Sequence, residues 1–135
     1  MSSPPNVLFV EDNAGDITLL KSAFDQCWPG VCLHTVSTAD KAAAFIDGQG
    51  TVTPDLNLIL LDLNLPGISG KTVLERMGTS RRAPVVVFSS SCRQQEIDEC
   101  YRLGASLYVV KPNHWNGYID LAASFAKLAA LSPCC

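Results

Sequence analysis

The sequence predicts an α/β protein in which a parallel five-stranded sheet is covered by helices on both faces. Five short apolar runs alternate with five segments whose apolar residues recur at helical spacing, without internal repeats. The runs are continuously apolar, which is typical of strands buried on both faces. With 135 residues, 47% of them hydrophobic and 17% charged, the chain has the size and composition of one compact domain. We expect its core to span about residues 6–131, between short flexible tails.

The first strand, helix and second strand follow each other closely. Residues 7–10 are a β-branched and aromatic run that stops at two acidic residues, so they are expected to form a buried strand. Residues 14–27 then place an apolar side chain at every third or fourth position, which indicates one face of a helix. Gly30 marks the end of this helix, and residues 31–36 are the second expected strand.

The middle of the chain repeats the pattern. A helix is expected over residues 39–46 because a hydroxyl residue just before it can cap its first turn. Residues 56–61 are an apolar run that stops at an aspartate, and they are expected to be the third strand. After a Leu-Pro-Gly turn, a helix is expected over residues 70–77, and residues 84–88 form the fourth strand.

The last elements are predicted in the same way. Apolar residues from 97 to 103 share one helical face, and Gly104 ends that helix. Residues 107–110 are the fifth strand, followed by a helix with a buried stripe from residue 118 to residue 128. Between them, an X-Pro bond after Lys111 at a tight strand exit predicts a cis peptide that aims the lysine toward the strand ends.

Polar residues follow four of the five expected strands. They are Glu11, Asp12, Asp62, Ser89, Ser90 and Lys111. In the flavodoxin-like strand order 2-1-3-4-5 these four strands are neighbours, so their carboxyl ends converge at the edge where ligands bind. Three carboxylates repel one another unless a cation shares the site, and Mg²⁺ suits hard oxygen ligands at an open rim. With a lysine and a hydroxyl group opposite, the set fits a carboxylate that accepts a phosphoryl group.

At these residues the sequence resembles the receiver domain of two-component response regulators, the CheY-like superfamily. The resemblance spans nearly the whole chain. It rests on residues 7–13 (VLFVEDN), 60–67 (LLDLNLPG), 87–90 (VFSS) and 104–112 (GASLYVVKP). It implies a flavodoxin-like (βα)5 fold, a single receiver domain over residues 1–135, and a signalling protein that catalyses only its own phosphorylation and dephosphorylation.

The resemblance also implies roles for individual residues. Asp62 would accept a phosphoryl group from a sensor histidine kinase, assisted by Ser89 and Lys111. Mg²⁺ would be the cofactor, with no organic cofactor, and Ser89 and Tyr108 would form the switch that changes protein contacts. The expected metal ligands are the carboxylates of Glu11, Asp12 and Asp62 and the backbone carbonyl of Asn64. Asn13 and Asp16 are interpreted as residues that open the first helix.

A finer resemblance is to the stand-alone receivers that serve bacterial phytochrome kinases, carried by residues 11–16 (EDNAGD) and 63–66 (LNLP). Ala14 stands where Pro is commoner, and Ser69 where an Asp usually precedes the glycine. A homodimer through the fourth helix, fifth strand and last helix is expected, with Tyr101 and Trp115 as packing or partner residues. The alternative function is a degenerate receiver that acts as a phosphorylation-independent interaction module. A cobalamin-binding domain is a weaker alternative, because Asn64 replaces the metal-ligating His of its loop.

Composition excludes several other classes. The formal net charge of −3 argues against a nucleic-acid or anionic-membrane surface, and no apolar stretch approaches the ~20 residues of a membrane span. The six cysteines show no C-x-x-C spacing, so zinc and redox sites are not expected. Nucleotide-binding glycine motifs are absent from the sequence. A reduced, cytoplasmic protein is expected.

Overall fold

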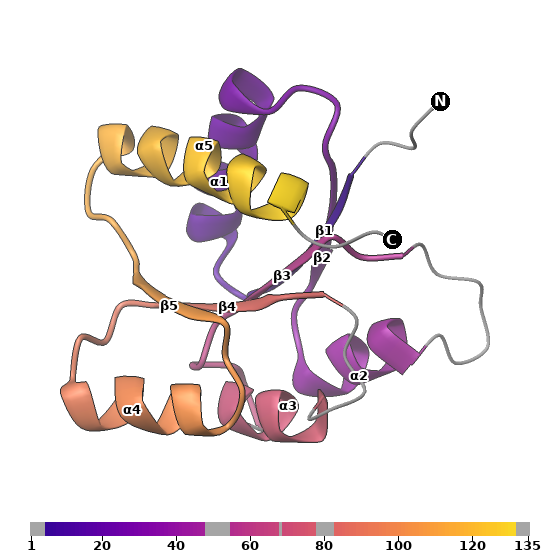
Figure 1. Ribbon diagram of the computed structural model, residues 1–135, viewed down its shortest axis with the longest axis vertical. Coiled ribbons are helices and arrows are strands. Elements are labelled where there is room, and N and C mark those ends of the chain that lie inside the picture. The colour runs from indigo at the N-terminus through magenta and orange to yellow at the C-terminus, as the bar shows by residue number, and fades with distance from the viewer. Residues whose placement is uncertain (1–4, 48–54, 68, 78–82, 132–135) are drawn as a thin grey trace.

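Five parallel strands form one sheet in the computed structural model, which describes residues 5–47, 55–67, 69–77 and 83–131 (Figure 1). The strand order is β2-β1-β3-β4-β5, so the predicted fold class and order are confirmed. The strands are β1 (Asn6–Val10), β2 (Cys32–Val36), β3 (Leu58–Leu61), β4 (Val85–Ser89) and β5 (Leu107–Val110). Since all neighbours are parallel, the carboxyl ends of the strands meet at one edge of the sheet.

Helices cover both faces of the sheet. They are α1 (Ala14–Cys27), α2 (Ala39–Asp47), α3 (Gly70–Met77), α4 (Gln94–Arg102) and α5 (Trp115–Leu131). Figure 1 shows α1 and α5 on one face and α2, α3 and α4 on the other. Helices α1 to α4 each carry the chain from the end of one strand back to the start of a parallel strand, which is why strands and helices alternate along the sequence, and α5 follows the last strand.

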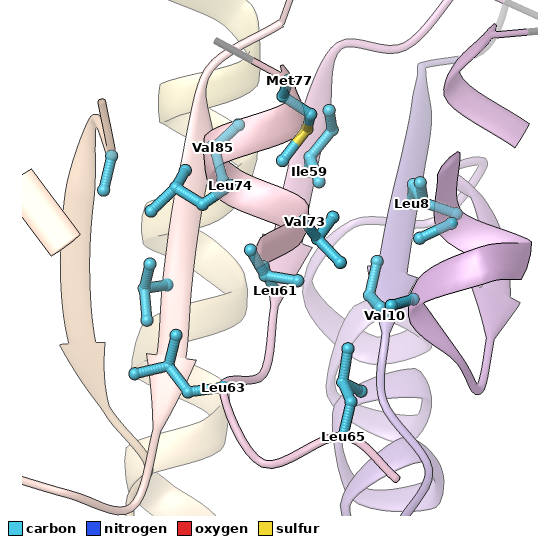
Figure 2. Packing of buried hydrophobic residues seen from close by; sticks show 14 of the residues in the cluster. Leu8, Val10, Ile59, Leu61, Leu63, Leu65, Val73, Leu74, Met77 and Val85 are labelled. Atoms are coloured by element: carbon cyan, nitrogen blue, oxygen red, sulfur yellow. The ribbon is translucent and has the colours of Figure 1, made fainter. Parts of the chain in front are cut away.

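The core consists of two apolar layers, one on each face of the sheet. Successive strand residues point to opposite faces, so Leu8 and Val10 pack toward α2–α4 whereas Val7 and Phe9 pack toward α1 and α5. Figure 2 shows the first layer, in which α3 contributes Val73, Leu74 and Met77. Full burial of one such aliphatic side chain contributes roughly 1.5–3 kcal/mol, and this packing fixes the strand ends that carry the site.

Three elements begin two or more residues away from their predicted start, and the other starts agree within one residue. The third strand begins at Leu58, and Asn57 just before it accepts the N–H of Asn6 through its side chain at 2.9 Å while its own N–H donates to the carbonyl oxygen of Asn6 at 2.8 Å. The fourth helix begins earlier than expected, at Gln94, and the last begins at Trp115. Their first turns are largely polar or exposed, and such turns give no apolar periodicity to detect.

The chain ends lie largely outside the described residues. This applies to the expected tails, apart from residue 5, and to Cys134 and Cys135. The four described cysteines, Cys27, Cys32, Cys92 and Cys100, are free thiols. Within the described ranges, the helices all fall short of the length and apolar character that a bilayer crossing requires.

Candidate functional site

Three carboxylates gather at the carboxyl ends of β1 and β3. Glu11, Asp12 and Asp62 each place one oxygen so that these atoms all lie within 4.8 Å of one another. The N–H of Asp62 donates to the carbonyl oxygen of Val10 at 3.0 Å, which fixes the end of β3 beside β1. Glu11 is 1% exposed and Asp62 2% exposed, whereas Asp12 is exposed. The cluster therefore opens to solvent through Asp12.

Glu11 shows the electrostatic character of this cluster. Burial, and after it the neighbouring Asp62, raise the pKa of its carboxyl group to about 7 against the opposing effect of Lys111. Its Oε1 atom is buried without a hydrogen bond in proper geometry, although Lys111 Nζ lies 2.8 Å away. Such a concentration of hard, anionic oxygen atoms fits a divalent cation such as Mg²⁺.

Lys111 lies opposite the carboxylates, directly after β5. Its N–H donates to the carbonyl oxygen of Ser89 at 2.8 Å, so the backbone extends the pairing of β4 with β5. The Nζ atom lies 2.7 Å from Asp16 Oδ2, 2.8 Å from Glu11 Oε1 and 3.6 Å from Asp62 Oδ2. Burial lowers the pKa of Lys111, but its contacts with Asp16 and Glu11 and the charge of Asp62 outweigh burial and raise this pKa above its usual value. The side chain is therefore an ammonium ion.

The predicted cis peptide between Lys111 and Pro112 is wrong, since the described residues contain no cis peptide bond. The lysine reaches the carboxylates without one. Its backbone follows the direction of β5, and its long side chain carries Nζ over the ring of Phe88, 5.8 Å from the ring centroid. An extended strand exit and a flexible side chain are thus sufficient to place the charge.

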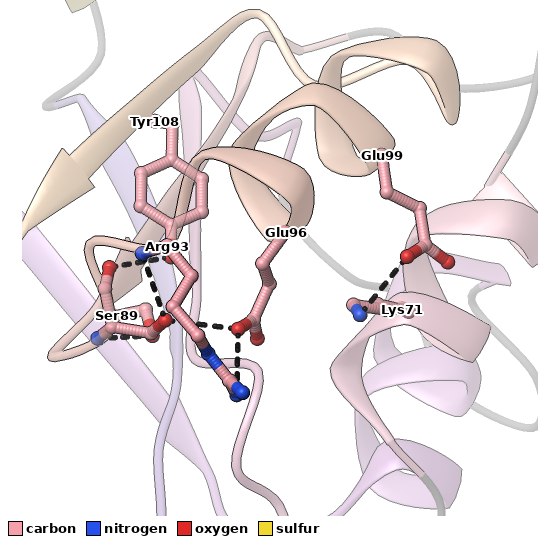
Figure 3. Close-up of polar contacts among 7 residues, drawn as sticks. Lys71, Ser89, Arg93, Glu96, Glu99 and Tyr108 are labelled. Atoms are coloured by element: carbon pink, nitrogen blue, oxygen red, sulfur yellow. Dashed lines mark hydrogen bonds and ion pairs between the residues drawn. The ribbon is translucent and has the colours of Figure 1, made fainter.

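Ser89 and Tyr108 are linked through the segment that follows β4 (Figure 3). Ser89 is fully buried, and its Oγ accepts the N–H of Ser91 at 3.2 Å. The Tyr108 hydroxyl donates to the carbonyl oxygen of Ser91 at 2.7 Å, and the Tyr108 N–H donates to the Tyr101 hydroxyl at 3.0 Å. Ser91 thus connects the two residues that the sequence predicts to act as a switch. Ser91 itself is not predicted from the sequence, because its contribution is made by backbone atoms.

Asp16 is likewise not predicted as a partner of Lys111. Its interpretation as a helix-opening residue is confirmed, because Asn13 Oδ1 accepts the Asp16 N–H at 2.9 Å as an N-cap. The same geometry directs its carboxylate to Lys111 Nζ at 2.7 Å. The signal available in the sequence is its position in the first turn of a helix that begins directly after the strand-end carboxylates.

Asn64 lies on the exposed loop after Asp62. Its N–H donates to Asp62 Oδ1 at 3.2 Å, whereas Lys111 Nζ faces the other oxygen, Oδ2. The hydrogen bond from Asn64 therefore helps to orient the carboxylate. Each oxygen of Asp62 therefore has its own polar neighbour. The role of the Asn64 carbonyl oxygen as a metal ligand stays a prediction.

We expect Mg²⁺ to stabilise the folded chain. At a concentration about a hundred times its dissociation constant, a ligand specific to the folded state adds ~2.7 kcal/mol, which raises the melting temperature by about 10 °C. Asp12→Asn should remove most of this shift, because the exposed Asp12 is a predicted ligand and not part of the core. Thermal melts in Mg²⁺ and in chelator measure the effect, with Asp25→Asn as the charge-matched control. Equal shifts in the wild type and Asp12→Asn would contradict this site.

Comparison with known proteins gives consistent matches over most of the chain. The family model described as the response regulator receiver domain matches residues 7–121. The response regulator Rcp1 of Synechocystis is 34% identical over 116 residues, which cover 82% of this chain and 79% of that protein. The crystal structure of the phosphorylated cyanobacterial phytochrome response regulator RcpA superposes with a TM-score of 0.84 at 29% identity, covering 96% of both chains.

A further solved structure is that of the Mn²⁺-bound form of response regulator Rcp1. It superposes with a TM-score of 0.80 at 28% identity and covers 92% of this chain and 93% of that chain. These similarities extend over the strands and helices that position the carboxylate cluster.

Proposed function

Because the chain belongs to the response regulator receiver domain family of two-component signalling, we propose that it accepts a phosphoryl group on Asp62 from a sensor histidine kinase and changes its protein contacts in response. One observation carries this proposal. The buried carboxylate of Asp62 lies in a cluster with Glu11 and Asp12, and Lys111 Nζ is 3.6 Å from its Oδ2 atom. A carboxylate that can act as the nucleophile, two further carboxylates that could hold a metal ion and an ammonium group thus lie close together at one sheet edge.

In the proposed reaction an Asp62 carboxylate oxygen forms a bond to phosphorus while the phosphorus–nitrogen bond of the kinase phosphohistidine breaks. The imidazole leaves with the bonding electron pair and takes up a proton. The Lys111 ammonium group and the Ser89 hydroxyl are the chain's own donors to the oxygens of the transferred group. Mg²⁺, held by Glu11, Asp12, Asp62 and the carbonyl of Asn64, would offset negative charge on these oxygens. Asn64 N–H keeps the Asp62 carboxylate oriented during the transfer.

We further propose a phytochrome-type histidine kinase as the phosphoryl donor. The similarity to a cyanobacterial phytochrome response regulator over 96% of both chains supports this partner class. Phosphotransfer from phytochrome kinases and from other histidine kinases of the same genome would test it. Preference for another kinase class would contradict it.

We also propose that phosphorylation is passed on as a change in homodimerisation through α4, β5 and α5. Exposed large apolar side chains lie on these three elements: Tyr101, Leu107, Val110 and Trp115. Aromatic side chains such as those of Tyr101 and Trp115 are enriched where protein surfaces associate.

Incubation with acetyl phosphate tests phosphoryl acceptance directly. We expect a mass gain of one phosphoryl group that depends on Mg²⁺ and that hydroxylamine removes, since an acyl phosphate is labile to hydroxylamine and a phosphoserine is not. Chelator should prevent the gain. No incorporation, combined with unchanged binding to a kinase, would instead favour the phosphorylation-independent interaction module.

The switch through Ser89 and Tyr108 gives a separate prediction. Beryllofluoride, a phosphoryl analogue, should strengthen dimerisation of the wild type by about one to two orders of magnitude. Ser89→Ala and Tyr108→Phe should respond much less, because the first loses the hydroxyl and the second loses the hydrogen bond to Ser91. Sedimentation with and without beryllofluoride measures the change. Ser22→Ala, an exposed residue of α1, is the control, and equal responses in all variants would contradict the switch.

A further inference from the structure

The ammonium group of Lys111 lies closer to Asp16 and Glu11 than to Asp62, the proposed phosphoacceptor. Its Nζ atom is 2.7 Å from Asp16 Oδ2 and 2.8 Å from Glu11 Oε1, but 3.6 Å from Asp62 Oδ2. The lysine side chain is 12% exposed, so little water competes for the ammonium group. The position of this charge is therefore set mainly by Asp16 and Glu11.

Asp16 is well suited to hold a charge in place. It lies in the first turn of α1, and Asn13 Oδ1 fixes its backbone N–H at 2.9 Å. Its side chain is 25% exposed and donates nothing, so its carboxylate acts only as an acceptor and a negative charge. Unlike Glu11, it does not belong to the group of carboxylates that could hold a metal ion.

We propose that Asp16 is a positioning residue that holds the Lys111 ammonium group away from Asp62 and so weakens the binding of the phosphoryl group. This inference rests on the proposed function of Asp62. A phosphoryl group carries about −1.5 to −2 charge and three strong acceptor oxygens, and it competes with Asp16 for the same ammonium group. Capture of Lys111 by the phosphoryl group thus requires loss or lengthening of the contact with Asp16.

The partly buried surroundings of Asp16 support this competition. Burial raises the pKa of the Tyr118 hydroxyl, and the charge of Asp16 raises it further, so the field of Asp16 extends to α5. Tyr118 is 3% exposed and packs edge-on against Phe88, the ring beneath Lys111 Nζ. Tyr118 of α5 thus lies close enough to Asp16 and Lys111 for its pKa to respond to both charges.

The test is a titration with beryllofluoride at saturating Mg²⁺, in which calorimetry measures the affinity. Asp16→Asn should bind beryllofluoride about five- to tenfold more tightly than the wild type, because Lys111 no longer has to leave a charged partner. Asp16→Glu, which restores the charge, should return the affinity toward the wild-type value. Asp25→Asn makes the same charge change at an exposed site of α1 and should leave the affinity unchanged. If Asp16→Asn loses its cooperative melt, Asp16→Ser replaces it.

A second measurement separates lysine positioning from general charge repulsion. The Lys111 Nζ resonance, followed by ¹⁵N NMR, should move on beryllofluoride addition in the wild type and move less in Asp16→Asn. The inference would be overturned if the Lys111 resonance moved equally in the wild type and Asp16→Asn, or if Asp16→Asn bound beryllofluoride no more tightly than the wild type. An equal gain in beryllofluoride affinity in Asp25→Asn would also overturn it. If wild-type protein neither binds beryllofluoride nor accepts a phosphoryl group, the proposed function fails instead, so the two failures are distinguishable.

Discussion

Asp62→Asn should abolish Mg²⁺-dependent phosphorylation of the chain. The neutral amide is not a nucleophile toward phosphorus, and losing a covalent nucleophile lowers a reaction rate by about a thousandfold or more. The substitution keeps the size of the side chain at this nearly buried position, so the fold should be retained. Intact-mass analysis after incubation with acetyl phosphate measures the loss.

Asp55→Asn provides the matched control for this experiment. Asp55 is exposed and lies shortly before β3, whereas Asp62 follows it, so the two variants change the same charge at opposite ends of one strand. Asp55→Asn should accept the phosphoryl group at the wild-type rate. Hydroxylamine-labile phosphate that persists in Asp62→Asn would place the acceptor elsewhere and refute the proposed function.

Gly70→Ala should both destabilise the fold and impair the site. A Cβ atom at Gly70 would lie 2.3 Å from the carbonyl oxygen of Asp62 and 2.8 Å from Leu63 Cα, which are backbone atoms. The Gly70 N–H also donates to the Leu63 carbonyl oxygen at 3.1 Å, so α3 is held tightly against the segment that carries Asp62. Relieving the clash requires that segment to move. We expect a loss of about 2–4 kcal/mol in the free energy of unfolding.

The displacement of Asp62 should also slow phosphorylation of the folded protein by about tenfold or more, because small errors in the position of a nucleophile are costly. Chemical denaturation and initial rates with acetyl phosphate measure the two effects. Gly15→Ala is the control, since its added Cβ meets only the side-chain oxygen of Asn13 at 3.1 Å and a helix favours alanine. Wild-type stability and rate in Gly70→Ala would contradict the predicted close approach.

Much of this architecture can be predicted from the sequence because the strands are buried on both faces. Continuous apolar runs such as residues 7–10 indicate where the strands lie, and the residues that end those runs include Glu11, Asp62 and Lys111. The observed sheet brings these three side chains together at one edge. The early starts of α4 and α5 cannot be predicted in this way, because exposed polar turns carry no periodic signal.

The contacts of Asp16 and Ser91 cannot be predicted from the sequence for a different reason. A carboxylate at the start of a helix has a sufficient local explanation, so nothing in the sequence requires it to reach a lysine 95 positions away. Ser91 acts through its carbonyl oxygen and N–H, which any residue type except proline would offer. The cis peptide is a wrong expectation because proline permits this geometry without requiring it.

The hydrogen bonds of Tyr108 connect the site around Asp62 with a surface residue that a kinase or another partner can cover. Tyr108 is bonded on one side to the Ser91 carbonyl and on the other to the hydroxyl of Tyr101, which is 44% exposed. If the proposed switch transmits phosphorylation outward through this chain of contacts, thermodynamic reciprocity requires the reverse transmission as well. A partner that covers Tyr101 and prefers the phosphorylated form must favour phosphorylation at equilibrium, or the binding of beryllofluoride, by the same factor by which phosphorylation tightens its own binding. The partner's concentration would then help to determine how much of the protein is in the phosphorylated form at equilibrium.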